Sequence, residues 1–328
     1  MTAVARLAAI VFLVAAVAGI VWLWSESRAP DRQEPARVVV EPGTPVRALG
    51  ARLADAGVVR SPLLFELWLR ARRDAGSIQA GTYEIPPGAS LPRVIDMLVG
   101  GETLLASVTI PEGLRLEQQA GVAARALGID SAAFAESATD PLLADSLGVD
   151  APTLEGYLFP ETYRVDPSTT ARELVRLMVA EFHRAFGEPW RSRADSLGRT
   201  VHEIVTLASI VEEEARVPEE RTVIAGVFWN RLRTGMKLEA DPTVQYALGS
   251  HRQRVLYRDL EVDSPYNTYL YPGLPPGPIA SPGRASLEAT LYPDSVPYLF
   301  FFATGEDGRH TFSETFAEHN RKRRELNR

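Results

Sequence analysis

The sequence predicts an α+β protein with a single apolar helix at its N-terminus. Its 328 residues exceed one typical domain and can bury a sizeable core, so one larger domain and at least one small module are expected. The uncharged run LAAIVFLVAAVAGIVWLW begins at Leu7 and ends at Trp24. Beyond it, short β-rich runs are followed by amphipathic helical patterns, and this change of hydrophobic period from two to 3.6 indicates strands followed by helices.

The N-terminal run is about as long as a helix needs to cross the hydrocarbon core of a membrane. Trp22 and Trp24 occupy positions typical of interfacial aromatic anchors. The alternative is a cleaved signal peptide, because Ala16 and Ala18 form a small-residue cleavage pattern, although the apolar run is long for that role. The sequence therefore predicts a membrane anchor.

The orientation of this anchor follows from its flanks. Arg6 and the amino terminus carry the positive charge on the short leading side, which favours an N-in, C-out arrangement. The following segment contains Pro30, Pro35 and mixed charges and is typical of a linker. We expect a cytoplasmic stub and transmembrane helix over residues 1–25, a linker over 26–37, and an extracytoplasmic body.

Composition excludes several classes of function. The chain has 42 acidic and 35 basic residues and a net charge of -7, whereas nucleic-acid binding usually requires a basic face. It contains no cysteine, which excludes a disulfide framework, a thiolate nucleophile and a zinc ribbon.

A weak internal repeat opens the body of the chain. VVVEPGTPVRALGARLADAGVV, YEIPPGASLPRVIDMLVGG and VTIPEGLRLEQQAGVAARALGI each contain a β-rich run, a turn ending in glycine, an apolar residue three positions later, and an amphipathic helix. Two interpretations stay open. The units are ordinary parts of an α+β domain, or the first two form a small βααβ carbohydrate-binding module with residues 62–72 as an intervening helix. The paired positions are Gly43 and Val46, Gly88 and Leu91, and Gly113 and Leu116.

A run of glutamates raises the question of catalysis in the stretch LASIVEEEA, residues 207–215. At about 100° per residue along a helix, Glu213 points away from an apolar stripe, whereas Glu212 and Glu214 lie at its two edges. Apolar neighbours raise the pKa of an edge carboxyl toward the range in which it donates protons at neutral pH. Periodicity therefore leaves Glu212 and Glu214 as candidates. The stripe consists of Ile204, Leu207, Ala208 and Val211.

Two later segments, GVFWNRLRTGMKLEADPTVQYALG and DSPYNTYLYPGLPPGPIASPG, place polar and aromatic residues around turns rich in glycine and proline. Such rigid turns are typical of a chain that shapes a cleft. An earlier segment, EGYLFPETYRV, combines Glu155 and Glu161 with aromatic residues that line a cleft or fill a core. The polar and aromatic residues of the two later segments are Asn230, Arg231, Asp241, Thr243, Tyr246, Tyr266, Asn267, Thr268 and Tyr269.

Other chemistries find no support in the sequence. The motifs HExxH, GxxxxGK[ST] and GxSxG and a dinucleotide fingerprint are all absent. His310 and His319 have a spacing that fits no usual metal site. The sequence therefore predicts neither a metal nor a cofactor.

Seven segments of the chain resemble the YceG-like endolytic murein transglycosylases, the MltG family. The resemblance implies a LysM-like module over residues 38–106 and a catalytic domain over 107–328 that cuts peptidoglycan between N-acetylmuramic acid and N-acetylglucosamine. In the family the helix motif carries two glutamates separated by one residue, and the second is the essential acid, which corresponds to Glu214. The family commonly has a basic residue where this chain has Glu213. The segments are AGTYEIPPG, TIPEG, EGYLFPETY, LASIVEEEA, VFWNRLRTGMKLEADPTVQYALG, SPYNTYLYPGLPPGPIASPG and HTFSETFAEHN.

The resemblance also implies a mechanism and a location. Glu214 would protonate the glycosidic oxygen and then accept the proton of the muramoyl C6 hydroxyl, which closes a 1,6-anhydro ring. The partners would be glycan strands and cell-wall synthases, at the periplasmic face of the cell inner membrane. By motif and polarity, the candidates for substrate contact are Glu212, Asn230, Asp241, Thr243, Tyr266, Asn267 and Tyr269.

Two alternatives of other classes remain. A glycoside hydrolase would combine Glu214 with Glu212, Asp241 or Glu155 as its second carboxylate. Glu212 and Glu214 are unsuited to this pairing, because they diverge by roughly 160° around the helix axis. The other alternative is a non-catalytic scaffold that binds the cell wall through its small module.

Overall fold

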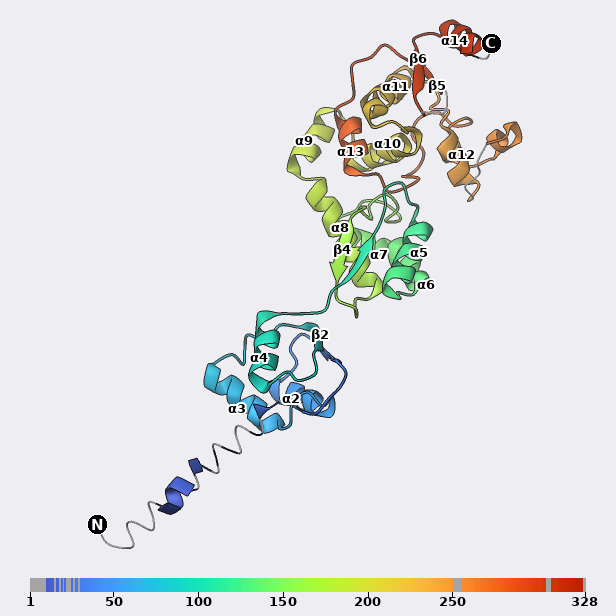
Figure 1. Ribbon diagram of the computed structural model, residues 1–328. Helices are drawn as coiled ribbons and strands as arrows, with labels where there is room; N and C mark the ends of the chain where they lie inside the picture. Colours follow the sequence, from blue (N-terminus) through green and yellow to red (C-terminus); the bar gives the residue numbers. More distant parts are fainter. Residues whose placement is uncertain are drawn as a thin grey trace. The chain divides into compact units, whose positions relative to one another are not determined.

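The computed structural model describes residues 10–14, 16, 17, 19, 21, 25, 27, 28, 30–249, 255–304 and 308–326 (Figure 1). Helices and short two-stranded sheets alternate along the chain, which confirms the predicted α+β class. The chain divides into two compact units. The first comprises residues 1–106 and 164–168, and the second comprises residues 107–163 and 169–328.

Among the described residues, no helix is both long enough and apolar enough to cross a membrane. Part of the predicted membrane-spanning run, including Leu7 and Trp24, lies outside the described residues. The membrane anchor therefore stays a prediction.

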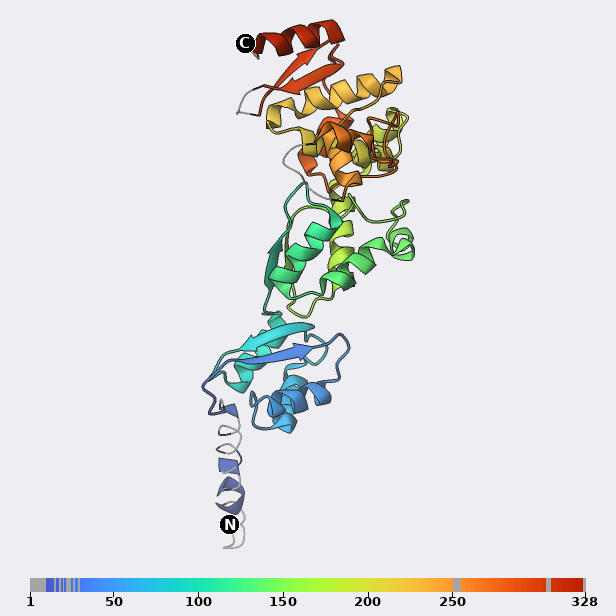
Figure 2. The ribbon, with the colours of Figure 1, turned by 90° about the vertical axis from the view of Figure 1, so that its right-hand side faces the viewer.

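Over residues 36–100, the first unit contains a two-stranded antiparallel sheet and three helices. Strand β1 (Ala36–Val40) pairs with β2 (Gly81–Ile85) in a register that sets Val38 opposite Tyr83 (Figure 2). Helices α2 (Val46–Asp55) and α3 (Pro62–Arg72) lie between these strands in sequence, so the chain has the βααβ order of one of the two interpretations of the repeat. Helix α4 (Leu91–Gly100) follows. Apolar side chains from all five elements form one core.

The repeat itself is confirmed at the level of local structure. Gly43, Gly88 and Gly113 adopt φ values of 77°, 77° and 75°, which lie in the left-handed region that favours glycine. In each unit the apolar residue three positions later is the first residue of a helix, at the starts of α2, α4 and α5 (Leu116–Leu127). A strand, β1, β2 or β3 (Ala106–Thr109), precedes each turn.

The second unit begins with a group of helices. It contains residues 107–109 of β3 and residues 162–163 of β4 (Thr162–Val165), and α5 contacts α6 (Ser131–Thr139), which contacts α8 (Ala171–Ala185). Helices α7 (Pro141–Ser146) and α9 (Glu188–Ser196) complete this part. The segment EGYLFPETY supplies several buried residues here, among them Tyr157, Leu158 and Tyr163.

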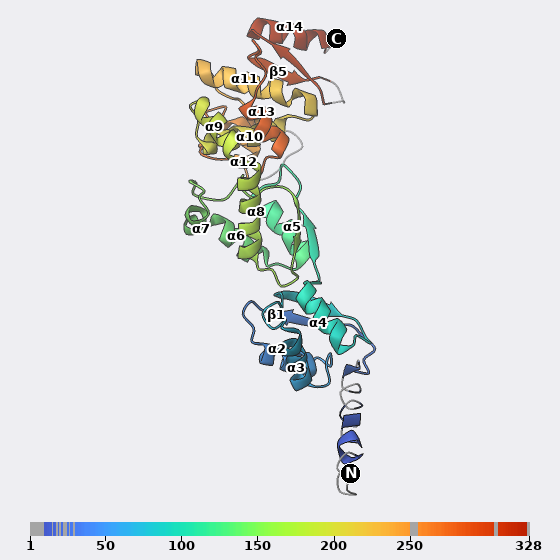
Figure 3. The same ribbon diagram turned by 90° about the vertical axis from the view of Figure 1, so that its left-hand side faces the viewer.

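The rest of the second unit is built around α10 (Val201–Glu214), whose start is capped by Thr200 and Glu203. This helix contacts α9, α11 (Arg221–Thr234), α12 (Asp241–Ala247) and α13 (Arg284–Leu291) (Figure 3). All eight residues from Ile204 to Val211 are buried. The single apolar stripe predicted from periodicity is therefore too narrow, because neighbours cover this helix on every side.

Short elements close the second unit. The 3-10 helices η1 (Pro218–Glu220) and η2 (Tyr257–Glu261) lie in connections between the larger helices. Strands β5 (Phe300–Ala303) and β6 (His310–Ser313) pair antiparallel, and α14 (Phe316–Leu326) contacts both.

Candidate active site

Glu214 is the last residue of α10 and lines a cleft of about 640 Å³. Its half-buried carboxyl makes no hydrogen bond or ion pair with another residue in the described part of the chain. Burial, reinforced by the nearby negative charge of Asp241, raises the pKa of Glu214 to about 8. The C-terminal end of a helix carries partial negative charge, which also disfavours a carboxylate there. Glu214 is therefore a protonated, accessible acid at neutral pH.

Asp241 and Tyr269 form a bonded pair in the same cleft. The Tyr269 hydroxyl donates a hydrogen bond of 2.6 Å to Asp241 Oδ1. Asp241 begins α12. The cleft therefore combines a neutral carboxyl on Glu214 with the hydrogen-bonded acidic side chain of Asp241, whose negative charge helps to raise the pKa of Glu214, an arrangement suited to acid catalysis beside a developing positive charge.

Glu212 has a different environment from Glu214, although only one residue separates them. Its Oε2 accepts a 3.0 Å hydrogen bond from the backbone N–H of Gly283, and its Oε1 lies 3.7 Å from the Arg221 guanidinium. The side chain is 8% exposed and does not line the cleft. Glu212 thus ties the end of α10 to the segment before α13, a role that the sequence left open.

Glu112 lies beside Gly283. A β-carbon at Gly283 would lie 2.0 Å from the Glu112 carboxyl, so a larger residue there would require the Glu112 side chain to move. The adjacent backbones also pair: the Gly113 N–H donates to Ser281 O at 2.9 Å, and the Ser281 N–H donates to Leu114 O at 3.0 Å. The TIPEG and IASPG segments are therefore held against each other at the end of α10.

Glu213 is exposed, as its predicted outward direction requires, but it lies at the cleft rather than on a remote face. Partial burial raises the pKa of Glu213 to about 6. A β-carbon at Gly113 would lie 2.9 Å from Glu213 Oε1, so the carboxyl is close to the TIPEG turn.

Three predicted substrate contacts have side chains that are bonded within the protein and do not line the cleft. Asn230 Nδ2 donates to the carbonyls of Val296 and Tyr298, which precede β5. Asn267 Nδ2 donates to Leu260 O and Val262 O, and the Thr243 hydroxyl donates to Ala240 O. These three side chains hold the turns around the cleft in position.

Tyr266 also lies outside the cleft lining. Its ring packs against Tyr246, with ring centroids 4.7 Å apart, and the Arg115 guanidinium lies 5.1 Å from the Tyr246 ring centroid. The structure therefore brings Glu214, Asp241 and Tyr269 together in one cleft and places Glu212, Asn230, Thr243, Tyr266 and Asn267 around it.

The residues considered as the second carboxylate of a hydrolase also differ in whether they line the cleft. Both carboxyl oxygens of Glu155 accept from the backbone N–H of Leu116, at 3.1 and 3.3 Å, at the start of α5. Burial raises the pKa of Glu155 to about 7. Of Glu155, Glu212 and Asp241, only Asp241 lines the cleft with Glu214.

The wall of the cleft contains residues that sequence reasoning did not select as site residues. Phe300, Phe301 and Phe302 of β5 and Phe316 of α14 line it, and Phe316 is 62% exposed. In the sequence, these phenylalanines belong to the apolar run LFFFA and the segment HTFSETFAEHN. Neither segment contains a catalytic motif. Arg216 and Arg323 also line the cleft without having been selected, and so do Arg231, His310 and His319, which the sequence analysis considered in other roles.

The two histidines considered as metal ligands have other surroundings. His310 Nδ1 lies 2.7 Å from Glu220 Oε2, and the His310 backbone N–H also donates to this carboxylate. His319 stacks on Phe316. Among the described residues, no group of three or more histidine, cysteine, aspartate or glutamate side chains could hold a metal ion.

The fold is α+β, and the cleft contains a neutral carboxyl group that can donate its proton. Together they define a protein whose site is suited to general acid catalysis. The particular family follows from comparison with known proteins. The chain belongs to the YceG-like family, whose model matches residues 38–325.

Named relatives agree with this assignment. An endolytic murein transglycosylase of Bacillus subtilis is 36% identical over 307 residues, which cover 89% of this chain and 84% of that protein. A protein of the same name from Streptococcus pneumoniae strain D39 is 32% identical over 315 residues, covering 87% of this chain and 57% of the longer relative. The crystal structure of a YceG-like protein from Listeria monocytogenes matches with a TM-score of 0.62 and 34% identity, covering 89% of this chain and all of that one.

Proposed function

We propose that this protein is an endolytic murein transglycosylase, which cleaves the glycan strands of peptidoglycan. The observation that carries the proposal is the carboxyl of Glu214, accessible in a cleft and with a pKa raised to about 8. A general acid needs a pKa near the working pH, and this side chain meets that requirement. The names of the Bacillus and Streptococcus relatives support the choice of substrate.

The reaction uses one carboxyl group twice. Glu214 donates its proton to the glycosidic oxygen between N-acetylmuramic acid and N-acetylglucosamine as the C1–O bond breaks and positive charge develops at the muramoyl C1. The resulting carboxylate accepts the proton of the C6 hydroxyl of the same sugar, whose oxygen bonds to C1. The products are a 1,6-anhydro-muramoyl end and a free N-acetylglucosamine hydroxyl, and Glu214 is again protonated.

Asp241 and Tyr269 act on this reaction from the same cleft. The negative charge of Asp241 favours the protonated form of Glu214 before the reaction and stabilises the oxocarbenium-like centre during it. Tyr269 holds the Asp241 carboxylate in place through its hydroxyl. Both side chains contact substrate in this proposal. The surrounding residues Glu212, Asn230, Thr243 and Asn267 keep the cleft in shape, and Tyr266 with Tyr246 presents aromatic surface beside it.

The remaining parts of the chain have roles in the same proposal. Residues 1–25 anchor the protein in the cell inner membrane with the body on the periplasmic side, where peptidoglycan lies. The module over residues 38–106 is LysM-like and binds glycan, which its βααβ order supports. The enzyme acts on strands delivered by cell-wall synthases.

The experiment is digestion of purified glycan strands by the full chain in ¹⁸O-labelled water, followed by mass spectrometry. Unlabelled 1,6-anhydro-muramoyl ends are expected, because the attacking oxygen comes from the sugar. Labelled reducing muramic acid as the primary product would instead establish hydrolysis, and Asp241, which lines the cleft with Glu214, would be the first residue to test as the second carboxylate. No cleavage at all would leave a wall-binding scaffold as the function.

A further inference from the structure

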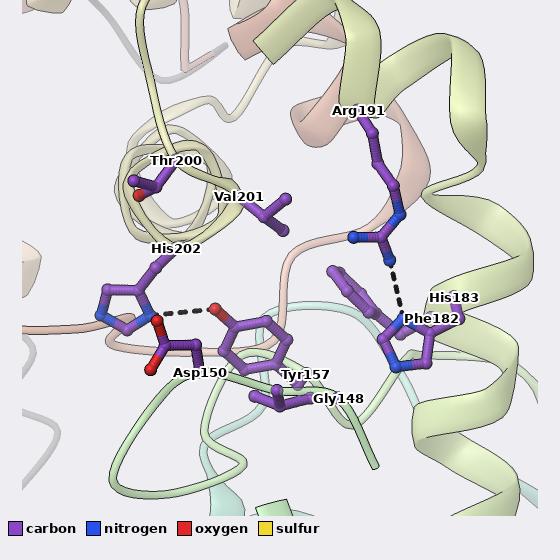
Figure 4. A pocket seen from close by; sticks show the side chains of 10 residues that line it. Gly148, Asp150, Tyr157, Phe182, His183, Arg191, Thr200, Val201 and His202 are labelled. Atoms are coloured by element: carbon purple, nitrogen blue, oxygen red, sulfur yellow. Dashed lines mark hydrogen bonds between the residues drawn. The ribbon is translucent and has the colours of Figure 1, made fainter. Parts of the chain in front are cut away.

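The second unit contains another cavity, of about 420 Å³, whose lining shares no residue with the Glu214 cleft. It lies among α8, α9, the first turn of α10 and the loop over residues 148–150, with Tyr157 in its wall (Figure 4). Neither the proposed reaction nor any motif discussed above assigns a role to it.

The cavity contains an arginine held by a histidine. Arg191 Nη2 donates to His183 Nδ1 at 2.9 Å, and His183 Nε2 lies 2.7 Å from Leu147 O. A guanidinium can only donate, so His183 Nδ1 accepts, and the ring proton is on Nε2, which donates to the carbonyl. His183 is therefore neutral and orients Arg191 without cancelling its charge. The salt bridges among the described residues include no partner for Arg191.

An opposite charge lies in the same cavity. Asp150 is exposed and has no ion-pair or hydrogen-bond partner among the described residues. Figure 4 shows Asp150 and Arg191 reaching the cavity from different sides. Both charges act on the Tyr157 hydroxyl: burial and then Asp150 raise the pKa of Tyr157, whereas Arg191 lowers it.

The wall between these charges is aromatic. The rings of Tyr157 and Phe182 pack edge to face, with centroids 5.0 Å apart. His202 Nδ1 lies 2.9 Å from the Tyr157 hydroxyl, and His202 Nε2 lies 2.9 Å from Pro276 O. These contacts hold the tyrosine ring in place and connect α10 to the loop around Pro276.

A purely structural role explains the two histidines, because each joins two segments of the chain. It does not explain why a cationic side chain, bonded only to the neutral His183 ring and lying over the Phe186 ring, shares a cavity with an anionic side chain when neither has an ion-pair partner among the described residues. An anion would meet repulsion from Asp150, and a cation would meet repulsion from Arg191. A ligand with both charges would satisfy both side chains, its carboxylate on the guanidinium and its ammonium on the aspartate.

We propose that this cavity binds a zwitterionic α-amino acid group, with Arg191 on its carboxylate, Asp150 on its ammonium, and the Tyr157 and Phe182 rings against its side chain. The source of that group rests on the proposed function: the stem peptides of peptidoglycan carry diamino acids whose free end is such a zwitterion. The cavity is then a recognition site for the peptide part of the substrate, separate from the site that acts on the glycan.

Isothermal titration of the full chain with meso-diaminopimelate tests the proposal, because this probe carries an α-amino acid group at each end. Pimelate, which lacks the ammonium groups, and cadaverine, which lacks the carboxylates, are the matched ligands. Binding of diaminopimelate is expected, with each matched ligand weaker by about tenfold or more, the effect of losing one charged hydrogen bond. No binding of diaminopimelate, or equal binding of either matched ligand, would overturn the proposal.

Variants locate the site. Arg191→Gln and Asp150→Asn are each expected to weaken diaminopimelate binding about tenfold or more. Arg176→Gln and Asp145→Asn, exposed changes on α8 and α7 outside the cavity, should not change it. Asp150 is itself exposed, so its variant keeps the test decisive if Arg191→Gln destabilises the fold. Unchanged binding in a folded Asp150→Asn variant would refute the assignment.

One more variant separates this proposal from the proposed function. Glu214→Gln should bind diaminopimelate as the unchanged chain does, since Glu214 lies in the other cleft. If the unchanged chain binds the probe but cleaves no glycan, the transglycosylase proposal fails and the amino acid site stands. If it cleaves glycan but does not bind the probe, the amino acid site fails alone.

Discussion

The hydroxyl of Tyr269 donates a 2.6 Å hydrogen bond to Asp241, and this pair lines the cleft that contains the carboxyl of Glu214. The two residues are brought together across 28 positions of the chain. Asp241 therefore has a bonded partner, whereas Glu214 has none among the described residues, so these two acidic side chains of the cleft are prepared for different roles.

Replacement of Glu214 by glutamine should reduce glycan cleavage by about 10²–10⁴-fold, the usual contribution of a general acid. Glutamine keeps the shape of the side chain and removes its proton. Release of anhydro-muropeptides, measured by mass spectrometry, is the readout. Glu219→Gln, an exposed change on η1 outside the cleft lining, is the matched control. Full activity in a folded Glu214→Gln variant would refute the assignment.

Asp241→Asn should move the alkaline limb of the pH-rate profile to lower pH. The protonated form of Glu214 is the active one, so activity declines as pH rises through its pKa of about 8. Removing the negative charge of Asp241 lowers that pKa. Asp263→Asn is the control, because Asp263 also accepts from a tyrosine, Tyr271, but does not line the cleft. An alkaline limb that stays in place or moves upward would contradict this account of Asp241.

Glu214 should also make stability depend on pH in a defined direction. The pKa of Glu214 is about 8 in the folded chain, whereas a free glutamate side chain has an ordinary pKa of 4.5, so the folded state holds the proton more tightly. Stability is therefore greatest below about pH 4.5 with respect to this group and falls as pH rises toward 8. Glutamine does not ionise. The melting temperature of the Glu214→Gln variant minus that of the unchanged chain should therefore increase between pH 5 and pH 9.

Differential scanning fluorimetry measures that gain. Each 1 kcal/mol corresponds to about 2–4 °C for a domain of 150–250 residues, so a gain of several degrees is expected. Glu219→Gln should show no such trend. A difference in melting temperature that is the same at both pH values would mean that folding does not raise the pKa of the Glu214 carboxyl.

Glu212→Ala should destabilise the fold while leaving the alkaline limb of the pH-rate profile in place. The change removes the acceptor for the Gly283 N–H and leaves Arg221 without this partner, which costs roughly 1–3 kcal/mol. Denaturant unfolding gives the loss, with Glu219→Ala as the exposed control. A stability unchanged by the alanine, or a shifted alkaline limb, would instead place Glu212 in the chemistry.

If the N-terminal apolar run is a membrane anchor, the mature protein should keep Met1 or Thr2. It should also resist extraction from membranes by alkaline carbonate. Mass spectrometry of the purified N-terminus and fractionation of membranes are the measurements. A first residue at Gly19 or beyond would show that the apolar run is a cleaved signal peptide.

Much of the local structure could be predicted because it depends on short-range chemistry. Gly43, Gly88 and Gly113 adopt the left-handed conformation, and helices begin three residues after each of them, as the repeat indicates. Periodicity also placed Glu213 on an exposed face and separated Glu212 from Glu214. It could not show that α10 is buried on every side, because the helices that cover it, α9, α11, α12 and α13, are separate elements of the chain.

The sequence by itself determined the α+β class, the strand-turn-helix units and, through its resemblance to the YceG-like family, the residue to consider as the acid. Only the tertiary structure decided which polar side chains line the cleft. Asn230 and Asn267 occur in the same kind of turn-rich segment as Asp241, but their amides are used to hold carbonyls of the chain, whereas Asp241 stays open to the cleft. Glu212 bonds to Gly283, 71 positions away, while Glu214 bonds to no described residue. Hydrophobic period depends on near neighbours in the chain, but the partner of a polar group depends on segments that folding brings together from far apart.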